Sequence, residues 1–64
     1  MMLSEDLIKS LVGMTESAAN EATKGFEVQV TRRDDEVLMS DMMMNMNRVK
    51  IELEKGIVVQ ASVG

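Results

Sequence analysis

The residues that could do chemistry gather between positions 34 and 46. Five of the eight methionines lie there, at positions 39, 42, 43, 44 and 46, together with the carboxylates of residues 34, 35, 36 and 41. The chain has no histidine and no cysteine, which excludes Ser/His/Asp and Cys/His catalytic sets, zinc fingers and disulfides. Thioethers can bind copper(I), but nothing supports them here, so we expect no metal and no cofactor. The carboxylates have no apolar pocket to tune them, so we expect no enzyme.

Composition narrows the possible partners further. The net charge is −4 and the one aromatic residue is Phe26, which argues against binding to phosphate backbones and against base stacking. No apolar run is longer than three residues, as at 42–44 and 57–59, which is far shorter than the roughly 20 residues that span a bilayer. We therefore expect neither a nucleic acid nor a membrane as partner. The amino terminus shows no secretory signal, so an intracellular location is the default expectation.

A single small domain must position these residues, because 64 residues are too few for two. The sequence predicts two helices, over residues 4–13 and 15–24. Ser4 and Thr15 are suitable N-caps, and Gly13 and Gly25 are suitable stops. We expect the second helix to be the main one, and residues 1–10 to form an amino-terminal helical extension.

Alternating apolar and polar residues predict three strands, over residues 26–31, 48–54 and 57–63. The turn at Gly56 makes the last two antiparallel, whereas the long connection before residue 48 makes the first two parallel. We therefore expect an α/β (α+β) fold with one main helix on a small mixed sheet. The predicted core residues are Leu7, Leu11, Val12, Ala19, Ala22, Phe26, Val28, Val30, Val49, Ile51, Leu53, Val58 and Val63.

The connection between the first two strands, residues 32–47, carries most of the functional information, and we expect an exposed loop over residues 32–46. Connections longer than roughly 12–15 residues are usually functional or disordered. Its charged first part, 32–36, is expected to be solvated. The methionine-rich second part has two structural interpretations. It could form a third helix over 36–46, or its methionine side chains could fill gaps in the core. The methionines exceed what so small a core could absorb, which favours an exposed partner surface.

The order of these features resembles the potato inhibitor I family of serine-protease inhibitors and a bacterial sister group of small inhibitors. The resemblance covers about residues 11–64. It is carried by Leu11-Val12-Gly13, Asn47-Arg48-Val49 and Val63-Gly64. It implies one inhibitor domain, 1–64, in which an exposed loop presents a peptide bond to the protease as a substrate would. A loop that is ordered before binding loses little further entropy in the complex.

The resemblance places the reactive bond between Met42 and Met43. The other binding-loop residues that it implies are Met39, Ser40, Asp41, Met44 and Asn45. Arg48 and Lys50, on one face of their strand, would support the loop, and the C-terminal carboxylate of Gly64 would pair with one of them. An apolar Met42 suits a subtilisin-like or chymotrypsin-like protease, not a trypsin-like one.

The sequence departs from the family at several points. Met43 stands where the family has an acidic residue, and Asp41 replaces a threonine, which would bring its carboxylate within reach of Arg48 or Lys50. The loop is about three residues longer on its amino-terminal side. Without the resemblance, Arg48 and Lys50 would simply be exposed strand cations. The alternative function is a non-inhibitory interaction module, or a homodimer contact, on the same scaffold.

Overall fold

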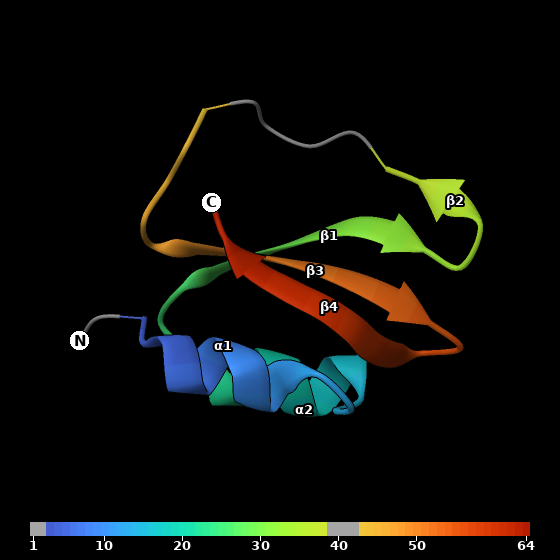
Figure 1. The fold of residues 1–64 in the computed structure, drawn as a ribbon, viewed down its shortest axis with the longest axis horizontal. Coiled ribbons are helices and arrows are strands. Elements are labelled where there is room, and N and C mark those ends of the chain that lie inside the picture. The colour runs from blue at the N-terminus through green and yellow to red at the C-terminus, as the bar shows by residue number, and fades with distance from the viewer. Residues whose placement is uncertain (1–2, 39–42) are drawn as a thin grey trace.

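The computed structural model describes residues 3–38 and 43–64 and shows a small α+β domain (Figure 1). Its elements are α1 (Glu5–Leu11), α2 (Glu16–Ala22), β1 (Glu27–Arg33), β2 (Glu36–Val37), β3 (Arg48–Glu54) and β4 (Ile57–Val63). The strands form one mixed sheet in the order β2-β1-β3-β4. Both helices lie on one side of this sheet, and the arm that leads into β3 rises on the other side.

Both helices begin at the predicted caps. The Ser4 hydroxyl accepts a hydrogen bond from the Leu7 amide, and the Thr15 hydroxyl accepts one from the Ala18 amide. Each helix has seven residues. The first ends two residues before Gly13, and the second ends three residues before Gly25. The first is more than an extension, because it contributes buried side chains to the core. In the described part of the chain, no helix is long and apolar enough to cross a membrane.

The strand directions agree with the prediction. β1 pairs with β3 in parallel, with Val28 beside Val49, and β3 pairs with β4 in antiparallel orientation. A tight turn at Lys55 and Gly56 joins β3 to β4, and both residues have positive φ angles. The α+β fold class and the mixed sheet are therefore as predicted.

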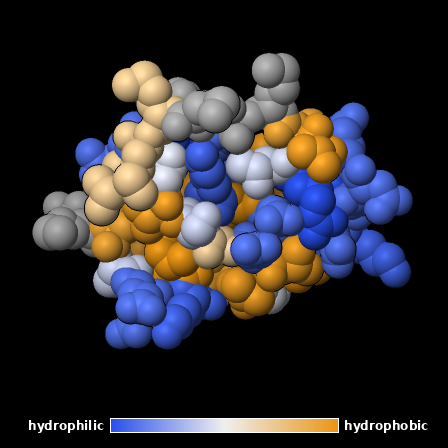
Figure 2. Space-filling model, turned by 45° about the horizontal axis from the view of Figure 1, so that its top comes forward, coloured by the Kyte–Doolittle hydropathy of each residue, from blue (hydrophilic) through white to orange (hydrophobic). Residues whose placement is uncertain are grey.

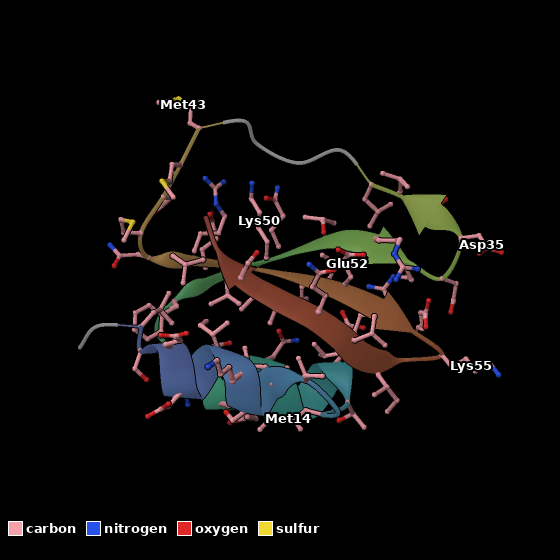
Figure 3. The ribbon with its side chains drawn as sticks, viewed as in Figure 1. Met14, Asp35, Met43, Lys50, Glu52 and Lys55 are labelled. Atoms are coloured by element: carbon pink, nitrogen blue, oxygen red, sulfur yellow. The ribbon has the colours of Figure 1, made fainter. Side chains whose placement is uncertain are left out.

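Alternation along β3 gives the sheet two different faces. Val49, Ile51 and Leu53 are fully buried against the helices, whereas Lys50 and Glu52 point to the opposite side (Figure 3). The buried apolar residues are Ile8, Leu11, Ala19, Val49, Ile51, Leu53 and Val58. Every side chain of the central strand therefore serves either the core or the polar face.

The core differs from the predicted set at Phe26, which is only half-buried and lies outside the core cluster, and in the helices. Ile8 is buried where Leu7 was expected, and Leu7 is half-buried. Val12 and Ala22, predicted to be buried, are exposed. Val12 follows the last residue of α1 and is already in extended conformation, so it no longer follows the helical spacing that would turn it inward.

The sheet has a fourth strand that the pattern does not predict. β1 continues to Arg33, the chain turns at Asp34 and Asp35, and β2 returns antiparallel beside it. Residues 32, 33, 36 and 37, predicted as loop, thus belong to the sheet. The third helix over 36–46 is wrong for the described residues, since 36–37 form a strand and 43–46 are not helical.

A bidentate ion pair between Arg33 and Glu16 links the end of β1 to α2. Arg33 Nη1 and Nη2 lie 2.9 and 3.1 Å from the two carboxylate oxygens of Glu16. The hydrogen bonds from Arg33 hold the pKa of Glu16 below its usual value. A carboxyl group whose pKa is lower in the folded state stabilises the fold only while it is ionised.

We therefore predict that Glu16→Gln lowers the free energy of unfolding at neutral pH. The difference in the free energy of unfolding between the variant and the wild type should reach its full value above the pKa of glutamate in the unfolded chain. It should vanish as the pH falls through the lowered pKa of Glu16. Urea unfolding at about pH 7 and about pH 3 measures it. Glu21→Gln, on the same helix, is the control. Equal losses for both variants at neutral pH would contradict the role of the ion pair.

Candidate functional site

The described half of the predicted site is the arm from Met43 to Asn47 together with the start of β3 (Figure 1). The expected binding-loop residues Met39, Ser40, Asp41 and Met42 lie outside the described residues. Of the two residues that flank the predicted reactive bond, the structure therefore describes Met43.

Arg48 lies beneath the arm and is only 5% exposed. Its Nη2 donates a 2.6 Å hydrogen bond to the Met43 carbonyl oxygen. Its Nε lies 3.3 Å from a carboxylate oxygen of Glu27, the first residue of β1. A guanidinium held between a carbonyl and a carboxylate forms strong, charge-assisted interactions. Arg48 thus joins the loop arm to the parallel pair of β1 and β3.

Asn45 shapes the arm through three hydrogen bonds. Its side-chain oxygen accepts from the Asn47 amide at 2.9 Å, and its carbonyl accepts from the Arg48 amide at 3.1 Å. Its own amide donates to the main-chain oxygen of Gly64 at 3.4 Å. Asparagine favours such turns because its short side chain can bond the backbone two residues on. The arm therefore returns to β3 through a closed turn.

Gly64 lies directly beside this turn. It is buried, and its amide donates a 3.0 Å hydrogen bond to the Arg48 carbonyl. The described contacts of Gly64 with the arm and with Arg48 run through backbone groups. Gly64, Asn45 and Arg48 are thus brought together.

Lys50 is the second predicted support residue. It is half-buried and projects from β3 on the side of the arm, away from the helices (Figure 3). The register places it beside Gln29 of β1 and Ser62 of β4. The Gln29 side-chain oxygen is buried and accepts no hydrogen bond from residues 3–38 or 43–64. Lys50 and Arg48 thus share a face, as their spacing predicts.

The arm presents its side chains to solvent. Met43 and Met44 are each 75% exposed, and Met46 is 68% exposed. Figure 2 shows pale orange side chains projecting at one edge of this side of the molecule, next to hydrophilic ones. These methionines are therefore not filler for the core. Long apolar side chains exposed in a row are available to a partner.

The sequence did not single out Glu27, although it contacts Arg48. A signal was available, because the in-register parallel pairing of the two predicted strands sets Glu27 opposite Arg48. Opposite charges on neighbouring strands attract each other across the sheet. Aligning the apolar positions of the two strands would have found the pair.

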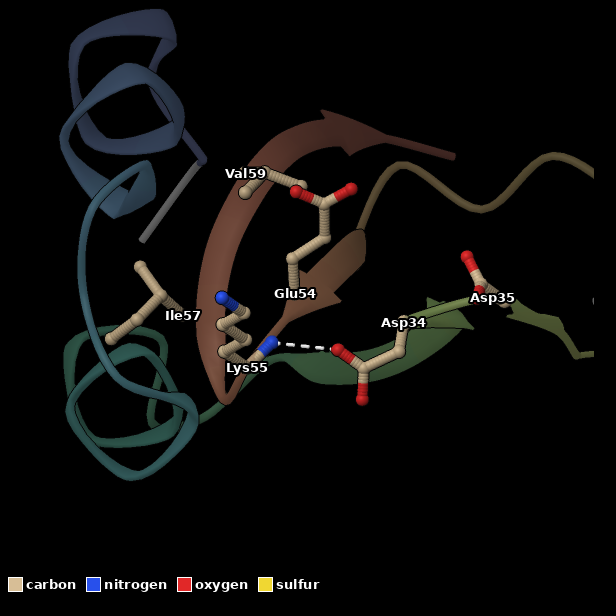
Figure 4. A pocket seen from close by; sticks show the side chains of 6 residues that line it. All are labelled: Asp34, Asp35, Glu54, Lys55, Ile57 and Val59. Carbon is tan, nitrogen blue, oxygen red and sulfur yellow. Dashed lines mark hydrogen bonds between the residues drawn. The ribbon is translucent and has the colours of Figure 1, made fainter.

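Residues 3–38 and 43–64 contain no group of three or more carboxylates that could hold a metal ion. An open depression at the far end of the sheet is lined by Asp34, Asp35, Glu54, Lys55, Ile57 and Val59 (Figure 4). It contains none of the predicted site residues. The Asp34 carboxylate there accepts a hydrogen bond from the Lys55 amide.

Comparison of the chain with protein-family models, with curated proteins and with solved structures gives no match. The assignment of a function therefore depends on the geometry of the arm.

The buried guanidinium gives a testable prediction. Arg48→Met keeps the length of the side chain but removes the donor to Met43 and the charge beside Glu27. We expect the free energy of unfolding to fall by about 2–3 kcal/mol, because hydrogen bonds to charged groups contribute that much. Urea unfolding measures the change. Lys24→Met, at an exposed position, should change it by less than about 0.5 kcal/mol. Equal effects of the two substitutions would contradict the role given to Arg48.

Proposed function

We propose that this protein inhibits a serine protease by presenting the Met42–Met43 bond as a substrate would. The observation that carries the proposal is the hydrogen bond from the buried Arg48 to the Met43 carbonyl. It restrains the residue that would become the new amino terminus after cleavage.

That restraint has a chemical consequence in a serine protease. Cleavage forms an acyl-enzyme on the residue before the bond and frees the amine of the residue after it. If Arg48 keeps Met43 in place, that amine stays beside the acyl group, where resynthesis of the bond competes with hydrolysis. A reaction between two groups that are held in place is much faster than the same reaction between free partners. A fixed Met43 therefore favours an uncut inhibitor.

Exposure and side-chain chemistry agree with this proposal. Met43 and Met44 lie on a part of the arm that is open to solvent. The unbranched thioether of Met42 would fill an apolar specificity pocket, whereas a trypsin-like pocket would leave its buried aspartate without a cation. The proposed targets are therefore subtilisin-like or chymotrypsin-like enzymes.

A second candidate function is favoured by the exposure of Met43, Met44 and Met46. Flexible methionine side chains adapt to irregular apolar surfaces. The same arm could therefore bind a non-protease partner or a second copy of the chain. This function needs the methionines as a group and does not depend on one peptide bond.

Titration of subtilisin and chymotrypsin tests the inhibitor proposal. We predict inhibition of at least one enzyme at micromolar protein, because Met42 fills its pocket. Met42→Ala should weaken inhibition by at least about 30-fold, the effect of losing an anchor worth about 2 kcal/mol. Met46→Ala, four residues away, should weaken it by less than about fivefold. Full activity of both enzymes, or equal effects of the two substitutions, would contradict the proposal.

Sedimentation separates the two candidate functions. The inhibitor should remain a monomer at micromolar concentrations and form a one-to-one complex with the protease. A module that binds its own copy should dimerise, and Met43→Ser combined with Met44→Ser should abolish the dimer because the apolar contact is lost. A dimer that this double substitution removes, together with full protease activity, would favour the second function.

A further inference from the structure

A second arginine, Arg32, stabilises the hairpin at the amino-terminal end of the loop. Its Nε lies 2.7 Å from Glu52 Oε1, and its Nη1 lies 3.2 Å from Glu54 Oε1. The same Nη1 donates a 2.6 Å hydrogen bond to the carbonyl of Asp34. One planar guanidinium therefore joins the turn between β1 and β2 to two carboxylates of β3. The planar fork of arginine suits several partners at fixed angles in a way that lysine does not.

Asp34 completes this connection from the turn. Its amide donates to the Leu53 carbonyl at 2.8 Å, and its carboxylate accepts from the Lys55 amide at 2.7 Å (Figure 4). Asp34 has a φ of 56°, a conformation that aspartate and asparagine adopt more readily than most residues. We call Arg32, Asp34, Glu52, Glu54 and Lys55 the clasp.

The clasp explains how so short a strand as β2 keeps its place. β2 has two residues, and a short two-stranded hairpin is marginally stable by itself. The chain leaves β2 at Leu38, whose amide donates a 3.0 Å hydrogen bond to the Thr31 carbonyl. Val37 beside it is 79% exposed, so burial contributes little to holding this end. The polar contacts of the clasp must therefore hold the hairpin in place.

Leu38 and Met43 are thus the two anchors of the loop. Arg48 holds the second anchor, and the clasp holds the hairpin that ends at the first. Residues 39–42 lie between them. Without the hairpin, the segment to be ordered would run from the end of β1 to Met43, residues 34–42. The entropic cost of closing a loop rises with its length, so the shorter segment is easier to order.

We propose that Arg32 and Asp34 are positioning residues of the binding loop, acting through the β1–β2 hairpin and not through contact with the protease. The assignment deepens the proposed function and, for its effect on inhibition, rests on it. The clasp accounts for the longer amino-terminal side of the loop, because those residues form the hairpin. It makes two arginines, Arg32 and Arg48, responsible for holding the two described ends of the loop.

The neighbouring residue supplies a matched control. Arg33 also ends β1 and also forms an ion pair, but with Glu16 of α2, away from the turn. Arg32→Gln and Arg33→Gln each remove one positive charge and one set of ion pairs. Only the first removes the donor to the Asp34 carbonyl. A merely structural role for Arg32 would make the two variants alike.

Hydrogen exchange of the Leu38 amide is the direct readout and needs no protease. In Arg32→Gln its exchange should accelerate by roughly tenfold or more, because opening the hairpin no longer breaks charge-assisted hydrogen bonds. In Arg33→Gln it should change by less than about threefold. The Ile51 amide of the central strand reports global stability, so that a general loss of stability is recognised.

A second pair of variants keeps the test decisive if Arg32→Gln does not fold. Asp34→Asn retains an acceptor for the Lys55 amide and tolerates the positive φ, so it should leave Leu38 exchange near the wild-type rate. Asp34→Ala removes the acceptor and should accelerate that exchange by roughly tenfold. Equal Leu38 exchange in Arg32→Gln and Arg33→Gln, or in Asp34→Asn and Asp34→Ala, would overturn the assignment.

Inhibition of subtilisin by the same variants distinguishes the two proposals. Arg32→Gln should weaken inhibition by roughly tenfold, while Arg33→Gln leaves it within about threefold, because a less ordered loop loses more entropy on binding. Selective acceleration of exchange with no inhibition even by the wild type would refute the proposed function and leave the clasp intact. Inhibition by the wild type with no selective effect on exchange would refute the clasp alone.

Discussion

The burial of one guanidinium, that of Arg48, constrains the rest of the structure. A charged group that is only 5% exposed is stable only if hydrogen-bonded partners replace the water it has lost. Arg48 finds a hydrogen-bond acceptor in the Met43 carbonyl and an ion-pair partner in the carboxylate of Glu27. The first belongs to the loop arm and the second to β1, so the position of the arm and the pairing of β1 with β3 depend on each other.

The central strand makes this coupling possible in so small a domain. Val49, Ile51 and Leu53 form the middle of the core, and the residues between them bear the polar contacts of the opposite face. Arg48 acts at the start of β3, whereas Glu52 and Glu54 receive Arg32 near its end. Because the chain has no cysteine, ion pairs and turn hydrogen bonds link its elements, as disulfides do in many small domains.

Periodic segments could be predicted from the sequence, and aperiodic ones could not. Alternation identified β3, β4 and their directions, and it placed Arg48 and Lys50 on one face. β2 has two residues and therefore no period to detect, and the charged run before it looked solvated because its ion-pair partners lie about 20 residues away in the sequence, as from Arg32 to Glu52. Ile8 took the place of Leu7 because neighbouring apolar residues leave the phase of a short helix open. The hydrogen bond to Met43 has no sequence signal of its own.

The central claim is that the loop holds one bond so that a protease can cut and remake it. Mass spectrometry of the chain incubated with a trace of subtilisin, starting once from intact protein and once from protein cut between Met42 and Met43, tests it most directly. The account predicts that both mixtures reach the same ratio of cut to intact chain, with no other cleavage between residues 38 and 46. Cleavage at several of these positions that runs to completion, with no resynthesis from the cut chain, would contradict it.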